Sequence, residues 1–303
     1  MFFFKMLGTA AGGGVPQWNC ACQFCDRCRT SPQNVAPRLQ LQAALSGDGK
    51  AWFLLNASPD LRIQIEANSE LQPSPGLGRR NTPITGIVLT TADLDQVLGV
   101  LLLREFQPLT IYATALVRKT LEANSFFRML ERVPNQLTWV EIVPGKKFSL
   151  GESGIYCTPI PLEGSLPFYA RELDTGEPGQ ASLGLLLEKD GRRIAYTPSL
   201  PEITKELREI YRTCDTVLAD GTFWSDAELN RTHAGTPLAR SIGHVPLSGE
   251  DGTIALLADL DFPRRIFVHI NNTNPILDAS SPEHRAVMDA GWQVAHDGWQ
   301  LDQ

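Results

Sequence analysis

The feature that most constrains the fold is one arrangement of elements that occurs in both halves of the 303 residues. In each half, two apolar stretches flank a turn rich in glycine and aspartate, at 47–50 and at 190–191. Each predicts a β-hairpin, because glycine reaches positive φ at little cost. A strand, a helix and another strand then follow. This order predicts an α/β fold with two mixed sheets packed face to face and helices outside, an α/β/β/α four-layer sandwich.

The individual elements follow from the spacing of apolar residues. Strands are expected at 1–7, 39–45, 51–56, 84–89, 183–188, 193–197, 215–220, 265–270 and 292–295. Helices are expected from Leu94 to Leu102, from Pro201 onward, at 252–260 and at 282–290. Residues 163–182 are rich in Gly, Pro and Glu and are expected to form a mobile loop or lid. We expect a single domain, 1–303, with pseudo-symmetric halves of about 1–150 and 151–303.

Composition and charge exclude two classes of protein. Hydrophobic residues make up 43% of the chain, yet no apolar run approaches the roughly 20 residues that a membrane span requires. The net charge is −7 and no basic cluster occurs, which argues against nucleic acid as a partner. Lys5 interrupts the apolar N-terminus, unlike the order in a signal peptide. We therefore expect a soluble, cytoplasmic protein with a small-molecule or short-peptide partner.

Four cysteines lie within nine residues, at Cys20, Cys22, Cys25 and Cys28. Thiolates at this spacing can occupy adjacent corners of a zinc tetrahedron, and a shell made only of protein ligands would make the zinc structural. The residues alone leave the fourth ligand open between Cys28 and a distant histidine. The alternative is a set of reduced, partly buried thiols. Either interpretation indicates a reducing compartment rather than disulfides.

Carboxylates stand where two expected strands end. Asp93 and Asp95 follow the strand at 84–89, and Asp220 ends the strand at 215–220. His269 lies at the end of a third strand. Asp93 and Asp95 could simply cap the next helix, since carboxylates favour helix N-termini. The alternative is a ligand or metal site, because strand ends at one rim of a layered α/β fold commonly form such sites.

These residues carry a resemblance to a known superfamily. The run 90–96, Thr-Thr-Ala-Asp-Leu-Asp-Gln, followed by Gly99, stands where the metallo-β-lactamase superfamily has T-H-x-H-x-D-H-x-x-G. Asp220 and His269 match its later aspartate and last histidine. Within that superfamily the chain resembles the pyrroloquinoline quinone (PQQ) biosynthesis protein B family. This narrower resemblance rests on residues 7–22, 55–62, 102–105 and 269–275.

The resemblance implies an α/β/β/α sandwich and a cytoplasmic role in the synthesis of the quinone cofactor. It also implies a structural zinc on Cys20, Cys22 and Cys25, with His244 as the fourth ligand and Cys28 left spare. Two activities have been described for this family. One is an iron-dependent oxygenase that hydroxylates the tyrosine-derived part of a Glu-Tyr precursor. The other is a carrier of PQQ or its precursor towards the periplasm. The resemblance further favours a homodimer.

This chain departs from the superfamily at its metal-binding motif. Thr91 and Asp93 replace the first two histidines, and Gln96 stands where the PQQ family usually has histidine. Hydrolysis at a dizinc centre is therefore not expected, because such a centre draws its affinity from several imidazoles. We expect instead a weak Fe²⁺ site on Asp95, Asp220 and His269. Asp93 would be a ligand or a base there, and Gln96 a poor oxygen ligand.

Two arginines are candidates for substrate binding. Arg62 and Arg104 could pair with substrate carboxylates, since a guanidinium matches a carboxylate bidentately. Both could equally form structural ion pairs. The competing hypothesis for the whole chain is a binding or carrier protein that keeps the pocket without turnover.

Overall fold

The computed structural model describes residues 1–231 and 236–301, and the contacts within it divide the chain into two compact units. The first contains Met1–Gly8, Leu41–Gly191 and Gly298–Gln303, and the second contains Thr9–Gln40 and Arg192–Asp297. The end of the chain belongs to the first unit because its backbone bonds to the opening strand, as in the bond from Leu301 N to Phe4 O at 2.9 Å. These boundaries differ from the predicted halves, and the single domain stays a prediction.

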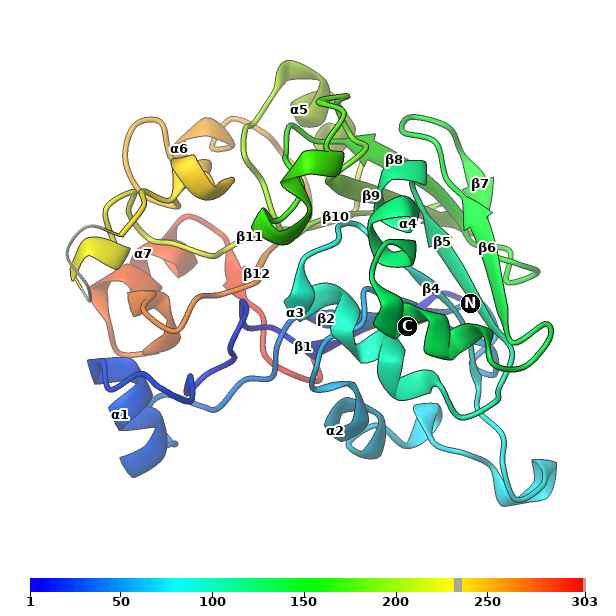
Figure 1. The fold of residues 1–303 in the computed structure, drawn as a ribbon. Coiled ribbons are helices and arrows are strands. Elements are labelled where there is room, and N and C mark those ends of the chain that lie inside the picture. The colour runs from blue at the N-terminus through cyan, green and yellow to red at the C-terminus, as the bar shows by residue number, and fades with distance from the viewer. Residues whose placement is uncertain (232–235, 302–303) are drawn as a thin grey trace. The chain divides into compact units, whose positions relative to one another are not determined.

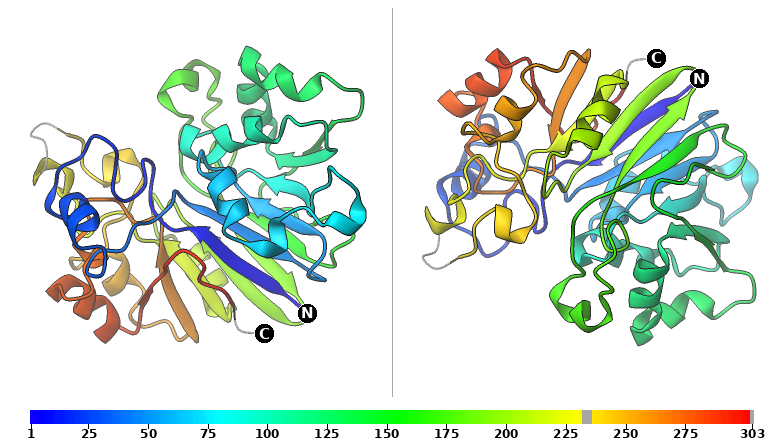
Figure 2. Two further views of the ribbon diagram at one scale, coloured as in Figure 1. Left: turned by 90° about the horizontal axis from the view of Figure 1, so that it is seen from below. Right: turned by 90° about the horizontal axis from the view of Figure 1, so that it is seen from above.

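A six-stranded mixed sheet forms the centre of the first unit (Figure 1). Its first three strands pair antiparallel, and the remaining pairs are parallel. In sheet order the strands are β1 (Phe3–Gly8), β2 (Gln42–Ser46), β3 (Trp52–Leu55), β4 (Ile84–Val88), β5 (Leu109–Ala113) and β6 (Leu137–Glu141). Figure 2 shows β1 lying along its neighbours in this sheet. Every strand predicted here is present, whereas β5 and β6 had no counterpart in the prediction.

The predicted hairpin of β2 and β3 is confirmed. Ser46 Oγ accepts a hydrogen bond from Gly49 N at 2.9 Å, and Gly49 has a φ of 75°. Asp48 Oδ1 accepts from the backbone N–H groups of Lys50 and Ala51 at 2.8 and 2.9 Å. The turn is therefore held by its own polar side chains and by a glycine in the left-handed region.

The helix predicted from Leu94 to Leu102 is present, but most of it is 3₁₀ rather than α. One α-turn, α3 (Leu94–Val97), is followed by a 3₁₀ segment, η3 (Leu98–Leu103). Gly99 N donates to Ala57 O at 2.9 Å, so the chain leaves the α-helical ladder at this point. Of the apolar residues at helical spacing, Val97 is fully buried and Leu101 packs against the core, whereas Leu94 and Leu102 are 49% and 42% exposed.

The rest of the first unit consists of short helices and an antiparallel meander. The helices are α2 (Leu61–Glu66), η1 (Ser69–Leu71), η2 (Pro75–Leu77), α4 (Ala115–Glu122), η4 (Ser125–Glu131) and η5 (Phe168–Leu173). The meander comprises β7 (Phe148–Ser149), β8 (Tyr156–Pro161) and β9 (Leu183–Lys189). The predicted lid at 163–182 contains η5, whose Tyr169 hydroxyl donates to Ala92 O at 2.5 Å. Its mobility stays a prediction.

Four parallel strands form the centre of the second unit: β10 (Arg192–Thr197), β11 (Thr216–Asp220), β12 (Arg264–Val268) and β13 (Gln293–Val294). Its helices are α1 (Gln23–Thr30), α5 (Lys205–Arg212), η6 (Leu229–Arg231), η7 (Arg240–Ile242), α6 (Thr253–Leu256), η8 (Pro275–Leu277) and α7 (Pro282–Asp289). In its core, Phe267 stacks on Trp292 with ring centroids 4.1 Å apart.

Three predicted boundaries in this unit need correction. The helix expected from Pro201 begins at Lys205, because the hydroxyl of Thr204 accepts from Leu207 N at 3.1 Å and caps it there. The strand expected to reach residue 270 ends at Val268, since His269 has a φ of 59°, outside the β region. The helix expected at 252–260 is the single turn α6.

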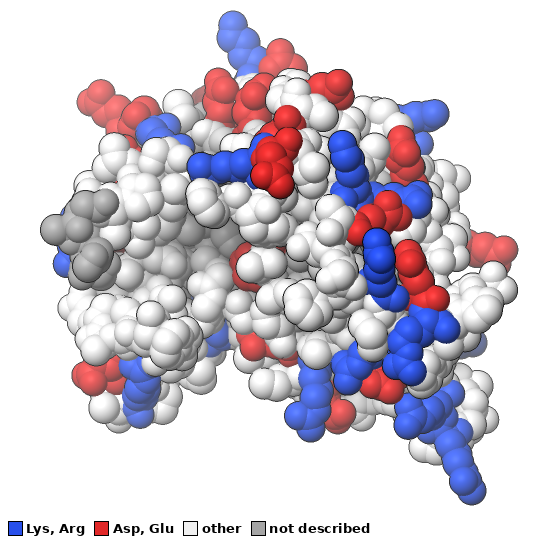
Figure 3. Space-filling model, in the orientation of Figure 1, with Lys and Arg blue, Asp and Glu red and all other residues white. Residues whose placement is uncertain are grey.

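The helices agree with the absence of a membrane span in the sequence. No helix in residues 1–231 and 236–301 combines the length and the apolar character that crossing a bilayer requires. On the face shown in Figure 3, Lys and Arg side chains are interspersed with Asp and Glu side chains.

The close approach at Gly99 provides a test of the packing in the first unit. A Cβ atom there would lie 2.2 Å from Ser58 O and 2.8 Å from Ala57 O, so the backbone has to shift. We expect Gly99→Ala to lower the free energy of unfolding by roughly 1–3 kcal/mol. Gly76→Ala is the matched control, because its Cβ would meet only Ser74 Oγ at 3.9 Å. Urea denaturation measures both, and equal stabilities of the two variants would contradict the expectation.

Candidate metal centres

Three ligand-type side chains of the second unit form one group. Asp220 is the last residue of β11 and is fully buried. His269 directly follows β12, and His244 follows η7 and its left-handed Gly243. One potential ligand atom from each residue lies within 4.8 Å of the others. The predicted pair Asp220 and His269 is thus brought together, and His244 joins it.

A chain of hydrogen bonds holds this group. Asp220 Oδ2 accepts from His244 Nδ1 at 2.7 Å and from Leu200 N at 2.9 Å. Asp220 Oδ1 accepts from Thr222 N at 2.9 Å and from the Thr222 hydroxyl at 2.5 Å. Thr222 Oγ1 also lies 2.8 Å from His269 Nδ1. All four contacts to Asp220 are therefore donated to it.

This network selects the tautomer of both rings. Because the Thr222 hydroxyl gives its proton to Asp220, its oxygen accepts from the Nδ1–H of His269. His244 likewise donates through Nδ1–H. When such a ring is deprotonated at Nε2, this atom has the lone pair that a metal requires. Burial opposes ionisation of Asp220, but the two histidines and the Thr222 hydroxyl outweigh it and hold the pKa of this carboxyl below its usual value.

The predicted acidic pair lies in the first unit, at the start of α3. Asp93 occupies the N-cap position, but its side chain makes no capping bond and instead accepts from Thr91 Oγ1 at 2.8 Å. The Asp93 side chain therefore does not have the helix-capping role that was the alternative to a ligand site. Burial together with the Asp93 charge raises the pKa of the nearby Tyr169 to about 12. Asp95 is half-buried. Metal ligation by Asp93 or Asp95 stays a prediction.

Gln96 takes part in a buried amide network. Its Oε1 accepts from Asn56 Nδ2 at 2.5 Å, and only 2% of the residue is exposed. Asn56 has a left-handed φ of 63°, and its Oδ1 accepts from Thr90 N at 2.8 Å. The amide oxygen of Gln96, predicted as a poor metal ligand, thus accepts a hydrogen bond from a neighbouring side chain.

The two candidate arginines lie on the surface of the first unit. Arg62 is exposed on α2. Arg104 follows η3, and 46% of its side chain is exposed. Its Nη2 lies 3.5 Å from Oε1 of Glu105. The ion pair of Arg104 matches the structural alternative for that residue. Substrate binding by either arginine stays a prediction.

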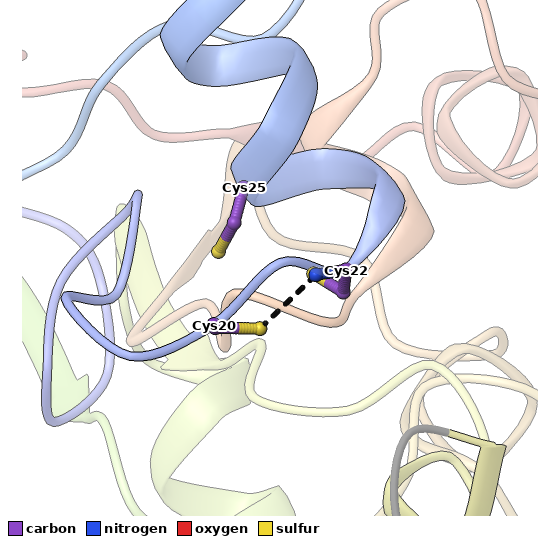
Figure 4. A group of neighbouring side chains, drawn as sticks. All are labelled: Cys20, Cys22 and Cys25. Carbon is purple, nitrogen blue, oxygen red and sulfur yellow. Dashed lines mark hydrogen bonds between the residues drawn. The ribbon is translucent and has the colours of Figure 1, made fainter.

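The cysteine group lies at the start of α1. Cys20 and Cys22 come from the preceding loop and Cys25 from the first turn, with their side chains turned towards one another (Figure 4). The three sulfur atoms lie within 4.8 Å of one another. Backbone N–H groups of Cys22 and Gln17 donate to Cys20 Sγ and Cys25 Sγ, both at 3.4 Å. Burial opposes ionisation of Cys20, but hydrogen bonds to its sulfur outweigh it and hold the pKa of this thiol below its usual value. Burial raises the pKa of Cys22 to about 11.

Asn272, rather than the predicted His244, contacts the three sulfur atoms. His244, expected as the fourth zinc ligand, instead donates to Asp220 and stacks on His269. Asn272 Nδ2 donates to the sulfur atoms of Cys20, Cys25 and Cys22 at 3.1, 3.3 and 3.9 Å. Sequence reasoning missed Asn272. The one available signal was its position three residues after His269.

The remaining thiols lie elsewhere. Cys28 is buried on α1 outside the group of three, and burial raises its pKa. Cys157 lies on β8 and Cys214 precedes β11, both buried. None of the six cysteines, all within the described ranges, forms a disulfide.

A cavity of about 1230 Å³ borders the cysteine group in the second unit. Cys20, Cys22 and Glu228 contribute to its lining. Glu228 is only 2% exposed and accepts from Trp224 N and from the Thr273 hydroxyl, both at 2.6 Å. Burial nevertheless raises the pKa of Glu228 to about 7, because desolvation outweighs these bonds.

Comparison with known proteins identifies the family. A model described as the beta-lactamase superfamily domain matches residues 51–270. Coenzyme PQQ synthesis protein B from Methylobacterium nodulans is 41% identical over 303 residues, with 98% of each chain covered. The protein of that name from Gluconacetobacter diazotrophicus is 40% identical over 310 residues, again with 98% of each covered. This chain belongs to the coenzyme PQQ synthesis protein B family.

Solved structures show the same fold. The crystal structure of Zn²⁺-bound PqqB from Methylobacterium extorquens superposes with a TM-score of 0.92 at 39% identity, covering 99% of this chain and 100% of that one. A diphosphatase of the PhnP family superposes at 0.70 with 19% identity, which is evidence for the fold alone. The predicted resemblance and the metallo-β-lactamase fold, with its mixed sheets and helices, are thus confirmed for this PqqB-family chain.

Replacement of Gln96 distinguishes a role in the buried amide network from a role as a metal ligand. Gln96→Met removes the acceptor of the buried Asn56 amide, so we expect the free energy of unfolding to fall by roughly 1–3 kcal/mol. Metal content should stay unchanged if the network is its only role. Gln72→Met is the control, because its side-chain bond to Glu66 O is exposed. A loss of bound metal without loss of stability would show instead that Gln96 is a ligand.

The raised pKa of Glu228 predicts a pH dependence of stability. A carboxyl with a folded-state pKa of about 7 stabilises below its usual value of 4.5, and this contribution disappears as the pH rises through 7. Glu228→Gln removes the cost of ionisation. We expect its stability relative to the wild type to rise by about 2–3 kcal/mol between pH 5 and pH 8. The exposed Glu250→Gln is the control, and denaturation curves with the same pH dependence in wild type and Glu228→Gln would contradict this.

Proposed function

We propose that this PqqB-family chain is an Fe²⁺- and O₂-dependent oxygenase that hydroxylates the tyrosine-derived part of a Glu-Tyr precursor of PQQ, in the cytoplasm. The observation that carries the proposal is the group of Asp220, His244 and His269. Two histidines and one carboxylate around open positions are typical of non-haem Fe²⁺ oxygenases. The ligands expected from the sequence, Asp95, Asp220 and His269, include a single imidazole. His244 provides the second imidazole in the proposed site.

The chemistry of the donor set fits such an ion. Both rings are held through Nδ1, which directs binding through Nε2, and Asp220 and Thr222 fix their orientation. An ion bound to Nε2 of His244 lies on the far side of this ring from Asp220, so ligation of the same ion by Asp220 requires the bond from His244 Nδ1 to give way. Bound ferrous iron would supply the activation of oxygen.

Other parts of the proposal rest on chemistry and on relatives. Thr91 and Asp93 in place of histidines disfavour a hydrolytic dizinc centre. Asp95 is proposed as a further ligand, Asp93 as a ligand or base, and Arg62 or Arg104 as partners of substrate carboxylates. We also propose a structural zinc on Cys20, Cys22 and Cys25, supported by their spacing and by the zinc-bound relative.

The second candidate is a carrier that binds PQQ or its precursor, for delivery towards the periplasm, without turnover. The buried bond between Asn56 and Gln96 favours it, since it engages the oxygen of a residue that occupies a metal-binding position of the motif. A carrier should bind a quinone in its metal-free form at micromolar concentration or below, and this binding should raise its melting temperature.

Oxygen dependence distinguishes the two candidates. The iron-loaded chain is incubated with a Glu-Tyr-containing peptide with and without O₂, and the peptide is analysed by mass spectrometry. We expect the gain of one oxygen atom only with O₂. His244→Ala and His269→Ala should each lower the rate by on the order of 10²-fold, because each removes an imidazole ligand. His296→Ala, an exposed histidine, is the control. Identical products with and without O₂ would reject the oxygenase.

A further inference from the structure

The six-stranded sheet of the first unit has one long edge that no described residue covers. Edge strands expose unpaired main-chain groups, and proteins usually shorten, cover or charge them. The edge at β1 is covered by the end of the chain, because Met6 N donates to Trp299 O at 2.8 Å. β7 and β13, which also have a single neighbouring strand, contain two residues each. β6, at the other edge of the six-stranded sheet, contains five (Figure 1).

We propose that β6 pairs antiparallel with β6 of a second copy of this chain, so that two six-stranded sheets become one continuous sheet. The sequence of β6, Leu-Thr-Trp-Val-Glu, has no proline or lysine to oppose such pairing. Its register with β5 is regular and contains no bulge. The proposal concerns a surface of the first unit and does not depend on the proposed enzymatic activity.

The main-chain groups of alternate β6 residues point away from the sheet. Gln136 O accepts from Leu109 N at 2.8 Å, so the even-numbered residues of this segment face β5. Successive residues of a strand direct their N–H and C=O groups to opposite sides. The outward groups therefore belong to Leu137, Trp139 and Glu141, and none of them has a hydrogen-bond partner among the described residues.

A twofold axis beside Trp139 makes this edge complementary to itself. Trp139 of one copy then pairs with Trp139 of the other, and each Leu137 pairs with a Glu141. All outward N–H and C=O groups are used, which gives about six main-chain hydrogen bonds. One patch that serves both copies is the arrangement in the commonest type of protein dimer. A second copy therefore fits this edge without any further feature.

The side chains on one face of β6 support the same register. Leu137 and Trp139 are half-buried, and pairing covers part of their remaining surface. Arg118 of α4 lies over the Trp139 ring, 5.5 Å from its centroid. Glu141 is exposed and forms no ion pair with a described residue. In the dimer it lies diagonally opposite Trp139 of the second copy, within reach of the Arg118 there. Opposite charges thus meet across the axis.

The expected area indicates a dimer of moderate affinity. A standard interface takes about 20–30 residues from each partner, more than β6 provides. Val133 and Val143 lie beyond the two ends of β6 and are both exposed. The antiparallel register brings Val143 of one copy near Val133 of the other, which adds apolar contact. We therefore expect the dimer to dissociate at micromolar concentrations.

Sedimentation velocity of the full chain tests the proposal between about 1 and 100 µM, the range in which such a dimer dissociates. The wild type should change from monomer to dimer. Glu141→Pro removes an outward N–H group at an exposed position and should weaken the dimer on the order of 10-fold. The peptide 137–141 should exchange its amide hydrogens more slowly in the dimer.

Charge exchange tests the contact across the axis. Glu141→Lys and Arg118→Glu should each weaken the dimer several-fold, and the double variant should recover part of the loss. Glu66→Lys is the control, because it makes the same charge change at an exposed position of α2 and should leave the dimer unchanged.

The outcomes decide the assignment. A wild type that stays monomeric would reject the proposal and leave the edge to a strand of a different protein. A dimer that Glu141→Pro does not weaken associates through another surface, which also rejects it. If Glu141→Pro fails to fold, as judged by circular dichroism, the charge variants still decide. Weakening by Glu141→Lys with recovery in the double variant supports the interface, and an unchanged dimer in Glu141→Lys overturns it.

Discussion

The buried carboxylate of Asp220 is the constraint on which the candidate site depends. An ionised carboxyl inside a protein costs several kcal/mol unless hydrogen bonds replace its water. Asp220 receives them from the backbone of Leu200 and Thr222, from the Thr222 hydroxyl and from His244. Segments that follow β10, β11 and η7 are thereby tied to one side chain. The Thr222 hydroxyl, which donates to Asp220, also contacts His269 Nδ1 and so fixes the orientation of that ring.

One turn contacts both candidate metal centres. His269 opens it beside Asp220, and Asn272 lies three residues later among the cysteine sulfurs. The two donor sets differ in chemistry, since imidazole and carboxylate suit iron whereas thiolates suit zinc. The second unit therefore presents two chemically different sets of potential ligands.

The superfamily scaffold is retained while its metal-binding motif has changed. Thr91 donates to Asp93, and Gln96 accepts from Asn56, at positions where the superfamily motif has histidines. Side chains that would be ligands in that motif here form hydrogen bonds within the first unit. A fold does not determine its chemistry, and the activity depends on the ligands that remain.

Local signals in the sequence were sufficient for much of the fold. The hairpin of β2 and β3 and the strand β4 were predicted because turn chemistry and β-branched residues act over a few positions. The helix after β4 was predicted, but its change to 3₁₀ at Leu98 was not, because the contact of Gly99 with Ala57 joins residues distant in sequence. The start of α5 was misplaced because the Thr204 cap was not recognised.

The candidate sites likewise combine features that the sequence predicted with features that only the structure revealed. The sequence by itself determined the family and the cysteine trio, whose members are close in the chain and need only one loop and one helical turn to meet. Only the tertiary structure decided that His244 belongs with Asp220, 24 residues away, and that Asn272 faces the sulfurs. The orientation of a ring or an amide is set by the segments that fold against it. The spacing of residues in the sequence does not predict those contacts.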